Sequence, residues 1–343
     1  MRALRLLLFF VVCVATVHQV IADDTSATLG AGGLIPLKST EIVMQSEDLS
    51  ISLHQVKVKY VFTNTTNHDI DATVAFPLPP LDGDLVAKES IDIPTQDPIN
   101  FLLFKLRVNG RTISPKLEIR AYRDDNGEDI TAQLRSLGLP LSVIDPKMES
   151  AFNKLPEKQR KRLEEEELIE DTGPQWPGSR HHIMWCGWKT RIEYYWHQRF
   201  PAHSSVYVGH TYRPVVGVTW DDWGDSAWFE MKPYCGAPEA DREIAHLKTL
   251  FPYKGDVMLY DKRIEFVLTT GNNWSGPIRS FHLTVHLDHA YDVLSSCMPG
   301  LKRTSPLTYE VHVSNFRPTS NLKLLILQPH RHPEKLHLPS YAP

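Results

Sequence analysis

The chain has 343 residues, of which 37 are basic and 41 acidic, and its formal net charge is −4. This acidic balance argues against a nucleic-acid partner, because binding to a phosphate backbone needs a basic face. The length is sufficient for two modest domains or for one large β domain.

Residues 1–22 have the order of an export signal. Arg2 and Arg5 precede an apolar run, and Ala22 is a small residue at the cleavage position before Asp23. The run is too short to cross a bilayer, and no later stretch approaches the roughly 20 apolar residues that a span needs. We therefore expect a secreted or periplasmic protein that has no transmembrane segment after cleavage; an uncleaved anchor is the alternative.

The first part of the mature chain predicts β structure. In residues 49–76, two stretches of alternating apolar and polar residues flank a polar turn at 64–69, a pattern that predicts a hairpin. A second hairpin is predicted at 101–119, because Asn109-Gly110 is the strongest short hairpin signal in the chain. Four strands with one apolar face each favour a sandwich over a parallel sheet.

The period becomes helical between residues 128 and 173. Asp129 is a suitable N-cap for a first helix that ends at Gly138, and a second short helix ends before Pro156. A third helix, at about 157–170, has few apolar anchors and places basic residues before acidic ones, an order that opposes the helix macrodipole. We expect this insertion to contribute little to the core of the sandwich.

Strands return after the insertion. Those at 191–200 and 205–212 are predicted to pair with each other and to complete a first unit spanning 23–234. A helix that begins at Pro238 leads into a second antiparallel unit within 235–330. The four strands of that unit are predicted at 263–269, 280–287, 307–313 and 321–327, before a tail at 331–343. The predicted fold is mainly β, with two antiparallel β-sandwich-like units, the first of which carries the helical insertion 128–173.

The chain contains four cysteines, of which Cys13 lies inside the export signal. Cys186, Cys235 and Cys297 remain, and an oxidising compartment would allow one disulfide among them. Because Cys235 and Cys297 both bracket the second unit, we predict that these two pair and that Cys186 stays free; two unpaired thiols are the alternative. No C-x-x-C pair is present, so neither a zinc ribbon nor a thioredoxin-type site is indicated.

Four strings occur in a familiar order: LGAGGL at 29–34, MQSEDLSIS at 44–52, VAFPLP at 74–79 and TGNNWSGPI at 270–278. Together they resemble a family of secreted bacterial proteins known as domain of unknown function 4424, over nearly the whole mature chain. The resemblance implies no activity, substrate or catalytic residue. The first unit is also similar to the vault/inter-α-trypsin domain, which agrees with a sandwich used as a structural or binding module.

The predicted strand that ends at Asp288 carries the best metal candidates. Alternation places His282, Thr284, His286 and Asp288 on one face, where residues two apart are separated by about 6.5–7 Å. His286 and Asp288 are therefore candidates to share an ion, with His282 as the third ligand. Two imidazoles and a carboxylate suit zinc or iron(II). The alternative is a polar solvent face without a metal.

A second candidate site lies in the region that contains all eight tryptophans of the chain. Trp220, Asp221, Asp222, Trp223 and Asp225 combine flat apolar rings with carboxylates, a combination suited to sugars. Oxygen-rich loops also hold calcium, but the EF-hand spacing is absent. An acidic turn between strands is the alternative interpretation.

No sequence signature of a hydrolase nucleophile, a zinc protease or a P-loop is present, so no catalytic residue is assigned and no cofactor is expected. We expect a non-catalytic, envelope-associated binding or scaffolding protein with an unknown protein or glycan partner. The alternative is an extracytoplasmic hydrolase that acts on glycans through carboxylates near residues 220–225. A cleft that holds two carboxylates, one with a raised pKa, would favour the enzyme.

Overall fold

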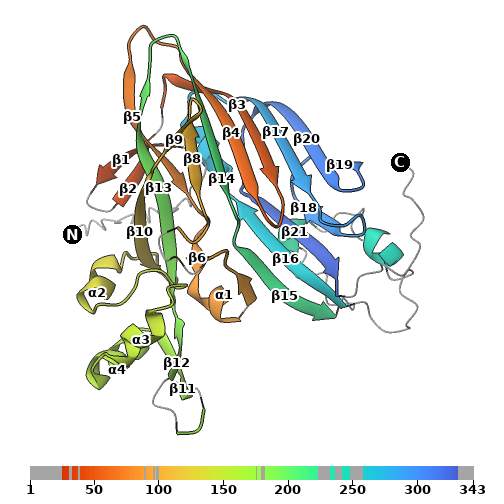
Figure 1. Ribbon diagram of the computed structural model, residues 1–343. Helices are drawn as coiled ribbons and strands as arrows, with labels where there is room; N and C mark the ends of the chain where they lie inside the picture. Colours follow the sequence, from red (N-terminus) through yellow and green to blue (C-terminus); the bar gives the residue numbers. More distant parts are fainter. Residues whose placement is uncertain are drawn as a thin grey trace, which may run out of the picture.

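The computed structural model describes residues 25–30, 33–37, 39–88, 90–95, 97, 100–174, 176–178, 182–222, 232–235, 242–247 and 258–330. The predicted export signal and the tail at 331–343 lie outside these residues. The described chain is mainly β, and its strands form antiparallel sheets with one parallel contact (Figure 1). The predicted fold class is therefore confirmed. None of the helices in this part of the chain is long and apolar enough to span a membrane.

Three large sheets make up the β structure of the described residues. The eight-stranded sheet has the order β19 (Lys302–Ser305), β20 (Thr308–Phe316), β17 (Ile278–His286), β3 (Ile42–Ile51), β4 (Val56–Asn64), β14 (Ser205–Tyr212), β8 (Lys105–Val108) and β9 (Arg111–Ile113). The six-stranded sheet has the order β10 (Lys116–Arg123), β13 (Trp188–Phe200), β5 (Ile70–Pro77), β1 (Thr25–Gly30) and β2 (Gly33–Leu37), and β6 (Leu81–Asp82) also pairs with β13.

The five-stranded sheet has the order β18 (Val293–Ser296), β21 (Leu322–Pro329), β16 (Met258–Phe266), β15 (Val216–Asp222) and β7 (Ser90–Asp92). A separate pair joins β11 (Ile169–Pro174) to β12 (His182–Cys186). The short helical elements are α1 (Gly83–Lys88) and the 3₁₀ turns η1 (Lys232–Tyr234) and η2 (Thr269–Asn273). Residues 242–247 are also helical, within the segment where a helix was predicted.

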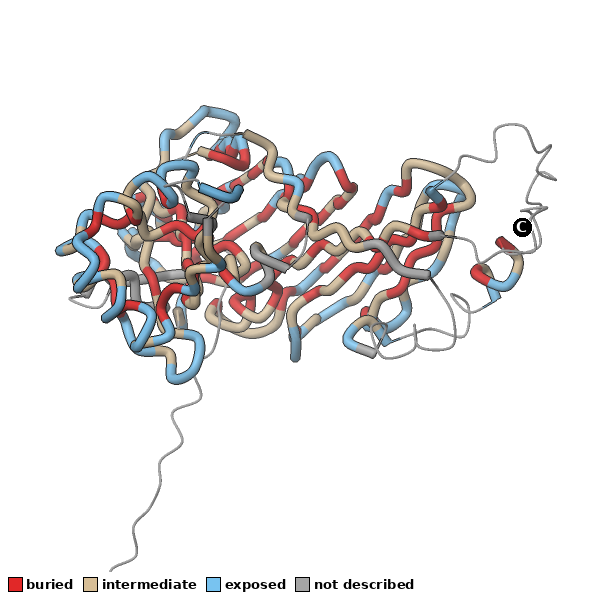
Figure 2. The backbone as a smooth tube through the Cα atoms, turned by 90° about the horizontal axis from the view of Figure 1, so that it is seen from below, coloured by how far each residue is buried: buried red, intermediate tan, exposed pale blue. Residues whose placement is uncertain are grey.

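One hydrophobic cluster takes in buried side chains from all three large sheets. Phe62 of the eight-stranded sheet lies 6.2 Å from Phe200 of the six-stranded sheet, measured between ring centroids. Phe76 of the six-stranded sheet lies 6.2 Å from Phe266 of the five-stranded sheet. Buried stretches follow the strands, and exposed stretches gather at the turns (Figure 2). The three sheets thus pack around one shared core, as the apolar faces of sandwich strands require.

Two predicted strand pairings are wrong. β4 pairs with β3 and β14, whereas β5 pairs with β13 and β1 in another sheet. Likewise β13 and β14 are consecutive in the chain but lie in different sheets. Alternation predicts which residues face the core, but it does not identify the neighbouring strand. The hairpin at Asn109-Gly110 is confirmed as β8–β9, and both turn residues have positive φ.

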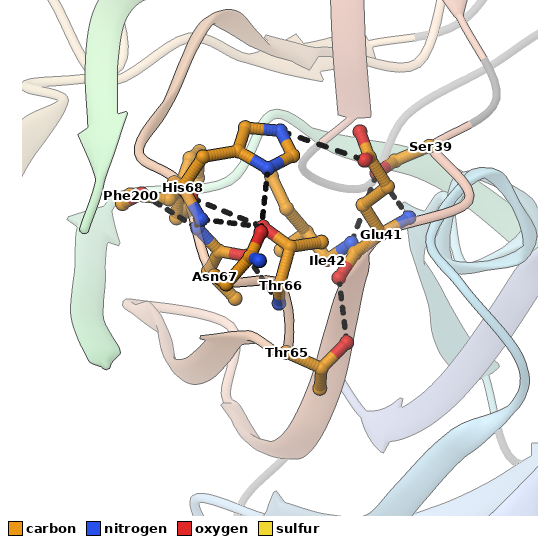
Figure 3. A network of polar contacts seen from close by, with 9 residues as sticks. Ser39, Glu41, Ile42, Thr65, Thr66, Asn67, His68 and Phe200 are labelled. Carbon is orange, nitrogen blue, oxygen red and sulfur yellow. Dashed lines mark hydrogen bonds and ion pairs between the residues drawn. The ribbon is translucent and has the colours of Figure 1, made fainter. Parts of the chain in front are cut away.

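The crossing from β4 to β5 is held by a polar network (Figure 3). The Asn64 side chain is fully buried and donates to the carbonyl oxygens of His68 at 2.8 Å and Phe200 at 2.9 Å. Its Oδ1 atom accepts from the backbone N–H of Thr66 at 2.9 Å. The Thr65 hydroxyl donates to the carbonyl oxygen of Glu41 at 3.1 Å. These bonds satisfy the backbone where the chain leaves one sheet for the other.

The strands beyond residue 235 do not form a sheet of their own in the described part of the chain. β17 and β20 extend the eight-stranded sheet, in which β17 runs parallel to β3. β16 and β21 join the five-stranded sheet beside β15. No local sequence pattern shows that strands so distant in sequence pair with each other. The sequence alone therefore predicts a separate second unit.

The insertion contains the three predicted helices, α2 (Thr131–Ser136), α3 (Met148–Asn153) and α4 (Glu157–Glu165), although α4 is shorter than the predicted 157–170 and β11 begins at Ile169. Asp129 Oδ1 accepts from the backbone N–H of Thr131 at 2.9 Å, at the start of α2. The helices bury a hydrophobic cluster that is separate from the main one, and Leu163 anchors α4 in it with 1% exposure. Figure 1 shows the insertion at one end of the six-stranded sheet.

Candidate ligand-binding site

A cleft of about 500 Å³ lies beside the five-stranded sheet. Its walls come from the segment between β5 and β7, from residues around β15 and from η1, and its floor comes from β16 and β21. β7, which follows α1 in the chain, pairs with β15 and brings this segment to the cleft. Segments that lie far apart in the sequence therefore meet at this cleft. Its volume is that of a small-molecule site.

The apolar wall is fixed by the position of α1. β6 pairs with β13 through Leu81 and Thr190, and α1 follows it directly. A Cβ atom at Gly83 would lie 1.9 Å from the carbonyl oxygen of Cys186, so only glycine allows α1 to approach β12 this closely. The apolar side chains that line this part of the cleft are Leu78, Leu81, Val86, Ile91, Phe101, Leu102 and Val215.

The floor of the cleft is polar. Arg263 Nη2 donates to Thr219 Oγ1 at 2.9 Å and lies 3.5 Å from Oδ2 of the fully buried Asp261, which compensates its charge. Lys323 stands opposite Glu265 in the β16–β21 register. No ion pair joins Lys323 to another residue in the described ranges. The cleft therefore combines an apolar wall with a cation that is available to a ligand.

A disulfide fixes the third wall. Cys235 and Cys297 form the bridge that the sequence predicted, and Cys186 is free and buried, also as predicted. The Ser295 hydroxyl donates to the carbonyl oxygen of Tyr234 at 2.9 Å. Tyr234 lines the cleft, so the covalent bond and the hydrogen bond together hold η1 at its rim. Burial raises the pKa of the Cys186 thiol to about 12, which makes it unreactive.

The two carboxylates that line the cleft have structural partners. Asp82 Oδ2 lies 3.3 Å from Lys189 Nζ, and its Oδ1 accepts from the backbone N–H of Asp84 at 2.9 Å. Glu265 Oε1 accepts from Asn321 Nδ2 at 3.2 Å. Burial raises the pKa of Glu193 to about 7, but Glu193 is not among the residues that line the cleft.

The model of one protein family matches residues 22–325: Domain of unknown function (DUF4424). The chain belongs to this family. The match confirms the resemblance seen in the four sequence strings. No curated protein matches the chain.

Among solved structures, the chain is similar to one described as a "putative nutrient binding protein" from Legionella pneumophila subsp. pneumophila str. Philadelphia 1. The two share 15% identity, and the match covers 85% of this chain and 68% of that chain with a TM-score of 0.42. A similarity at this level carries no argument about function.

The predicted metal ligands have partners that were not predicted. His282 Nδ1 lies 3.2 Å from Asp48 Oδ1, and the His282 ring stacks on His312 with centroids 3.9 Å apart. Asp288 Oδ2 lies 3.1 Å from His54 Nε2. His286 is exposed at the end of β17. Among the described residues no group of three or more His, Cys, Asp or Glu side chains is placed to hold a metal ion, and the metal site stays a prediction.

The predicted ligand loop lies partly within the described residues. Trp220, Asp221 and Asp222 are the last three residues of β15 and pair with β16, whereas Trp223 and Asp225 lie outside the described residues. Thr219, which lines the cleft, directly precedes them. The predicted loop thus begins one residue after a residue of the cleft. The apolar wall was not predicted, because no local sequence pattern indicates that α1 and β7 lie beside β15. The sugar-binding role of this loop stays a prediction.

Proposed function

We propose that this chain is a non-catalytic binding protein that holds a small amphipathic anion in the cleft. The observation that carries the proposal is the apolar wall around Val86 and Ile91 beside the ammonium group of Lys323, which has no ion pair among the described residues. An apolar pocket with a few polar groups that fix orientation is the usual form of a small-molecule site. Arg263 and Thr219 bond to each other and give the floor a second polar element.

Binding is favoured over hydrolysis because both cleft carboxylates hold structural bonds. A glycoside hydrolase needs two carboxyl groups that are available to substrate and water. Asp82 is bonded to Lys189 and to the backbone at the start of α1, and Glu265 is bonded to Asn321. The runner-up, a hydrolase that uses residues 220–225, has no support of this kind from the described residues.

We also propose an extracytoplasmic location. The Cys235–Cys297 disulfide supports it, because structural disulfides persist mainly in oxidising compartments. The order of charged, apolar and small residues at 1–22 supports it independently.

Titration with anilinonaphthalenesulfonate tests the proposed function. This probe has an aromatic body for the apolar wall and a sulfonate for Lys323, and its fluorescence rises in apolar surroundings. We expect saturable binding of one probe per chain, weakened about tenfold or more by Val86→Trp, which fills the cleft, and about threefold to tenfold by Lys323→Glu. Leu307→Trp, at a side chain that is 43% exposed and outside the cleft, is the matched control and should bind as the wild type does. Equal binding by Val86→Trp and the wild type would contradict the proposal.

A further inference from the structure

The outer face of the eight-stranded sheet carries a concentration of positive charge. Lys59, Gly209 and Arg107 stand in one cross-strand row over β4, β14 and β8, and Lys57, Thr211 and Lys105 form the next row. Arg111 follows on β9. Lys59 lies 3.4 Å from Asp48, whereas Lys57, Lys105, Arg107 and Arg111 have no ion pair within the described part of the chain. The formal net charge of the whole chain is −4, so this cluster is a local departure from an acidic protein.

Two cations of the cluster, Lys59 and Arg107, line a hollow of about 340 Å³, which we call the basic groove; Asp48, the partner of Lys59, also lines it. Lys59, Arg107, Tyr207, Gly209 and Gly110 are among the residues that line it. Gly209 lies in the middle of β14 and forms the floor of the basic groove. A Cβ atom at Gly209 would meet only the carbonyl oxygen of Val58, at 3.7 Å, which is ordinary contact. Packing therefore does not require glycine here. Glycine inside a strand weakens it and often marks close approach of a ligand, and both points indicate that the open floor is functional.

An exposed aromatic ring borders the basic groove. Tyr207 is 60% exposed, although large apolar rings on strands usually face the core. Its backbone is held on both sides, because its N–H donates to Asn109 Oδ1 at 2.9 Å and its carbonyl oxygen accepts from the Asn109 N–H at 2.8 Å. The ring therefore stands on a rigid part of the sheet and offers a flat face beside the cations.

We propose that the basic groove binds an acidic polysaccharide, independently of the cleft. A sugar ring can stack on Tyr207 while its carboxylate or sulfate groups contact Arg107 and Lys59. These two cations are two strands apart, which is about 9.6 Å and comparable to the span of a disaccharide. The Cys235–Cys297 disulfide indicates an oxidising compartment, where acidic polysaccharides are exposed. A single aromatic platform in an acidic protein fits a nucleic acid less well, since single strands need successive stacking rings.

Fluorescence anisotropy with labelled alginate oligosaccharide, a polyuronate, tests the proposal. Dextran of the same length is the uncharged probe, and a single-stranded oligonucleotide of matched charge is the alternative polyanion. We expect the wild-type chain to bind alginate saturably, with affinity that falls as salt rises, and to bind dextran at least about tenfold more weakly. Absence of saturable alginate binding, or tighter binding of the oligonucleotide, would overturn the proposal.

Two variants locate the binding. Arg107→Glu reverses a charge in the basic groove, and Gly209→Leu fills its floor; each should weaken alginate binding about tenfold or more. Lys302→Glu, an exposed cation on β19 of the same sheet, is the control and should change the affinity less than about twofold. If near-ultraviolet circular dichroism shows that Gly209→Leu is unfolded, Gly209→Ala replaces it. The alanine variant should bind alginate about threefold more weakly than the wild type. Equal weakening by Arg107→Glu and Lys302→Glu would mean non-specific attraction and would overturn the assignment of the site.

Discussion

Cys235 and Cys297, separated by 62 positions in the sequence, form a disulfide that ties η1 to the end of β18. Pro233 and Tyr234 of η1 line the cleft, and the Ser295 hydroxyl bonds to the carbonyl oxygen of Tyr234 at 2.9 Å. The disulfide therefore contributes both to the stability of the five-stranded sheet and to the shape of the proposed binding site.

Removal of the bridge should affect stability and binding together. The double variant Cys235→Ser, Cys297→Ser should lose about 3–4.5 kcal/mol of unfolding free energy, because the loop that the bridge closes gains entropy when unfolded. At temperatures where the variant stays folded, its affinity for anilinonaphthalenesulfonate should fall, since η1 then lacks its covalent bond to the end of β18. Chemical denaturation and probe titration measure the two effects. Unchanged probe affinity would mean that η1 does not shape the cleft.

Asn64 should be far more important for stability than its neighbour Asn67. Asn64→Ala removes the side-chain donor to the carbonyl oxygen of Phe200 in a buried bond and one of two side-chain donors to that of His68, which should cost about 2–3 kcal/mol of unfolding free energy. Asn67→Ala, at an exposed position of the same turn, should change stability by less than about 0.5 kcal/mol. Urea denaturation of both variants tests this difference, and similar midpoints would contradict the role of the network.

Gly83→Ala should displace α1. The added Cβ atom would overlap the carbonyl oxygen of Cys186, a backbone atom that cannot move away cheaply. We expect a loss of about 2 kcal/mol or more in unfolding free energy, together with weaker probe binding in the cleft. Gly209→Ala is the matched control for stability, because its Cβ atom meets only ordinary contact at 3.7 Å. A Gly83→Ala protein as stable as the control would be inconsistent with the close approach of α1 to β12.

Glu193 should make stability fall as the pH rises. Burial, together with the charge of Glu118 directly opposite on β10, raises the pKa of Glu193 from 4.5 to about 7, while Arg191 opposes the shift. Because the folded state binds this proton more tightly, stability is lost as the pH rises from about 4.5 through about 7 and stays lower above it.

Glu193→Gln removes this penalty. The variant should be more stable than the wild type at pH 8, by on the order of 2 kcal/mol, and the difference should vanish near pH 4.5. Thermal unfolding across this range measures it, with Glu170→Gln at an exposed carboxylate as the control. A difference that is constant with pH would show that Glu193 titrates normally.

The parts of the fold that depend on local pattern could be predicted from the sequence. The Asn109-Gly110 hairpin, the three insertion helices and most strand positions follow from short-range periodicity and turn chemistry. The pairing of β3 with β17 and the separation of β4 from β5 could not be predicted, because alternation is identical whichever strand is the neighbour. The cysteine pair was accessible to prediction because few cysteines leave few choices.

The cleft was largely beyond sequence analysis. Thr219 adjoins the predicted loop that starts at Trp220, but Val86, Arg263 and Lys323 reach the same cleft from separate segments. None of these residues belongs to a sequence motif, because apolar side chains and single lysines are common throughout the chain. The arrangement appears only after three sheets have assembled around one core.

A crystal structure with a bound ω-bromo fatty acid, bromo-octanoate, tests the central claim most directly, because the anomalous signal of bromine locates the apolar end of the ligand. The account predicts one bromine peak against the wall formed by Val86 and Ile91, with the carboxylate within hydrogen-bonding distance of Lys323 or Arg263. Ligand density only elsewhere on the surface, with an empty cleft at saturating ligand, would contradict it.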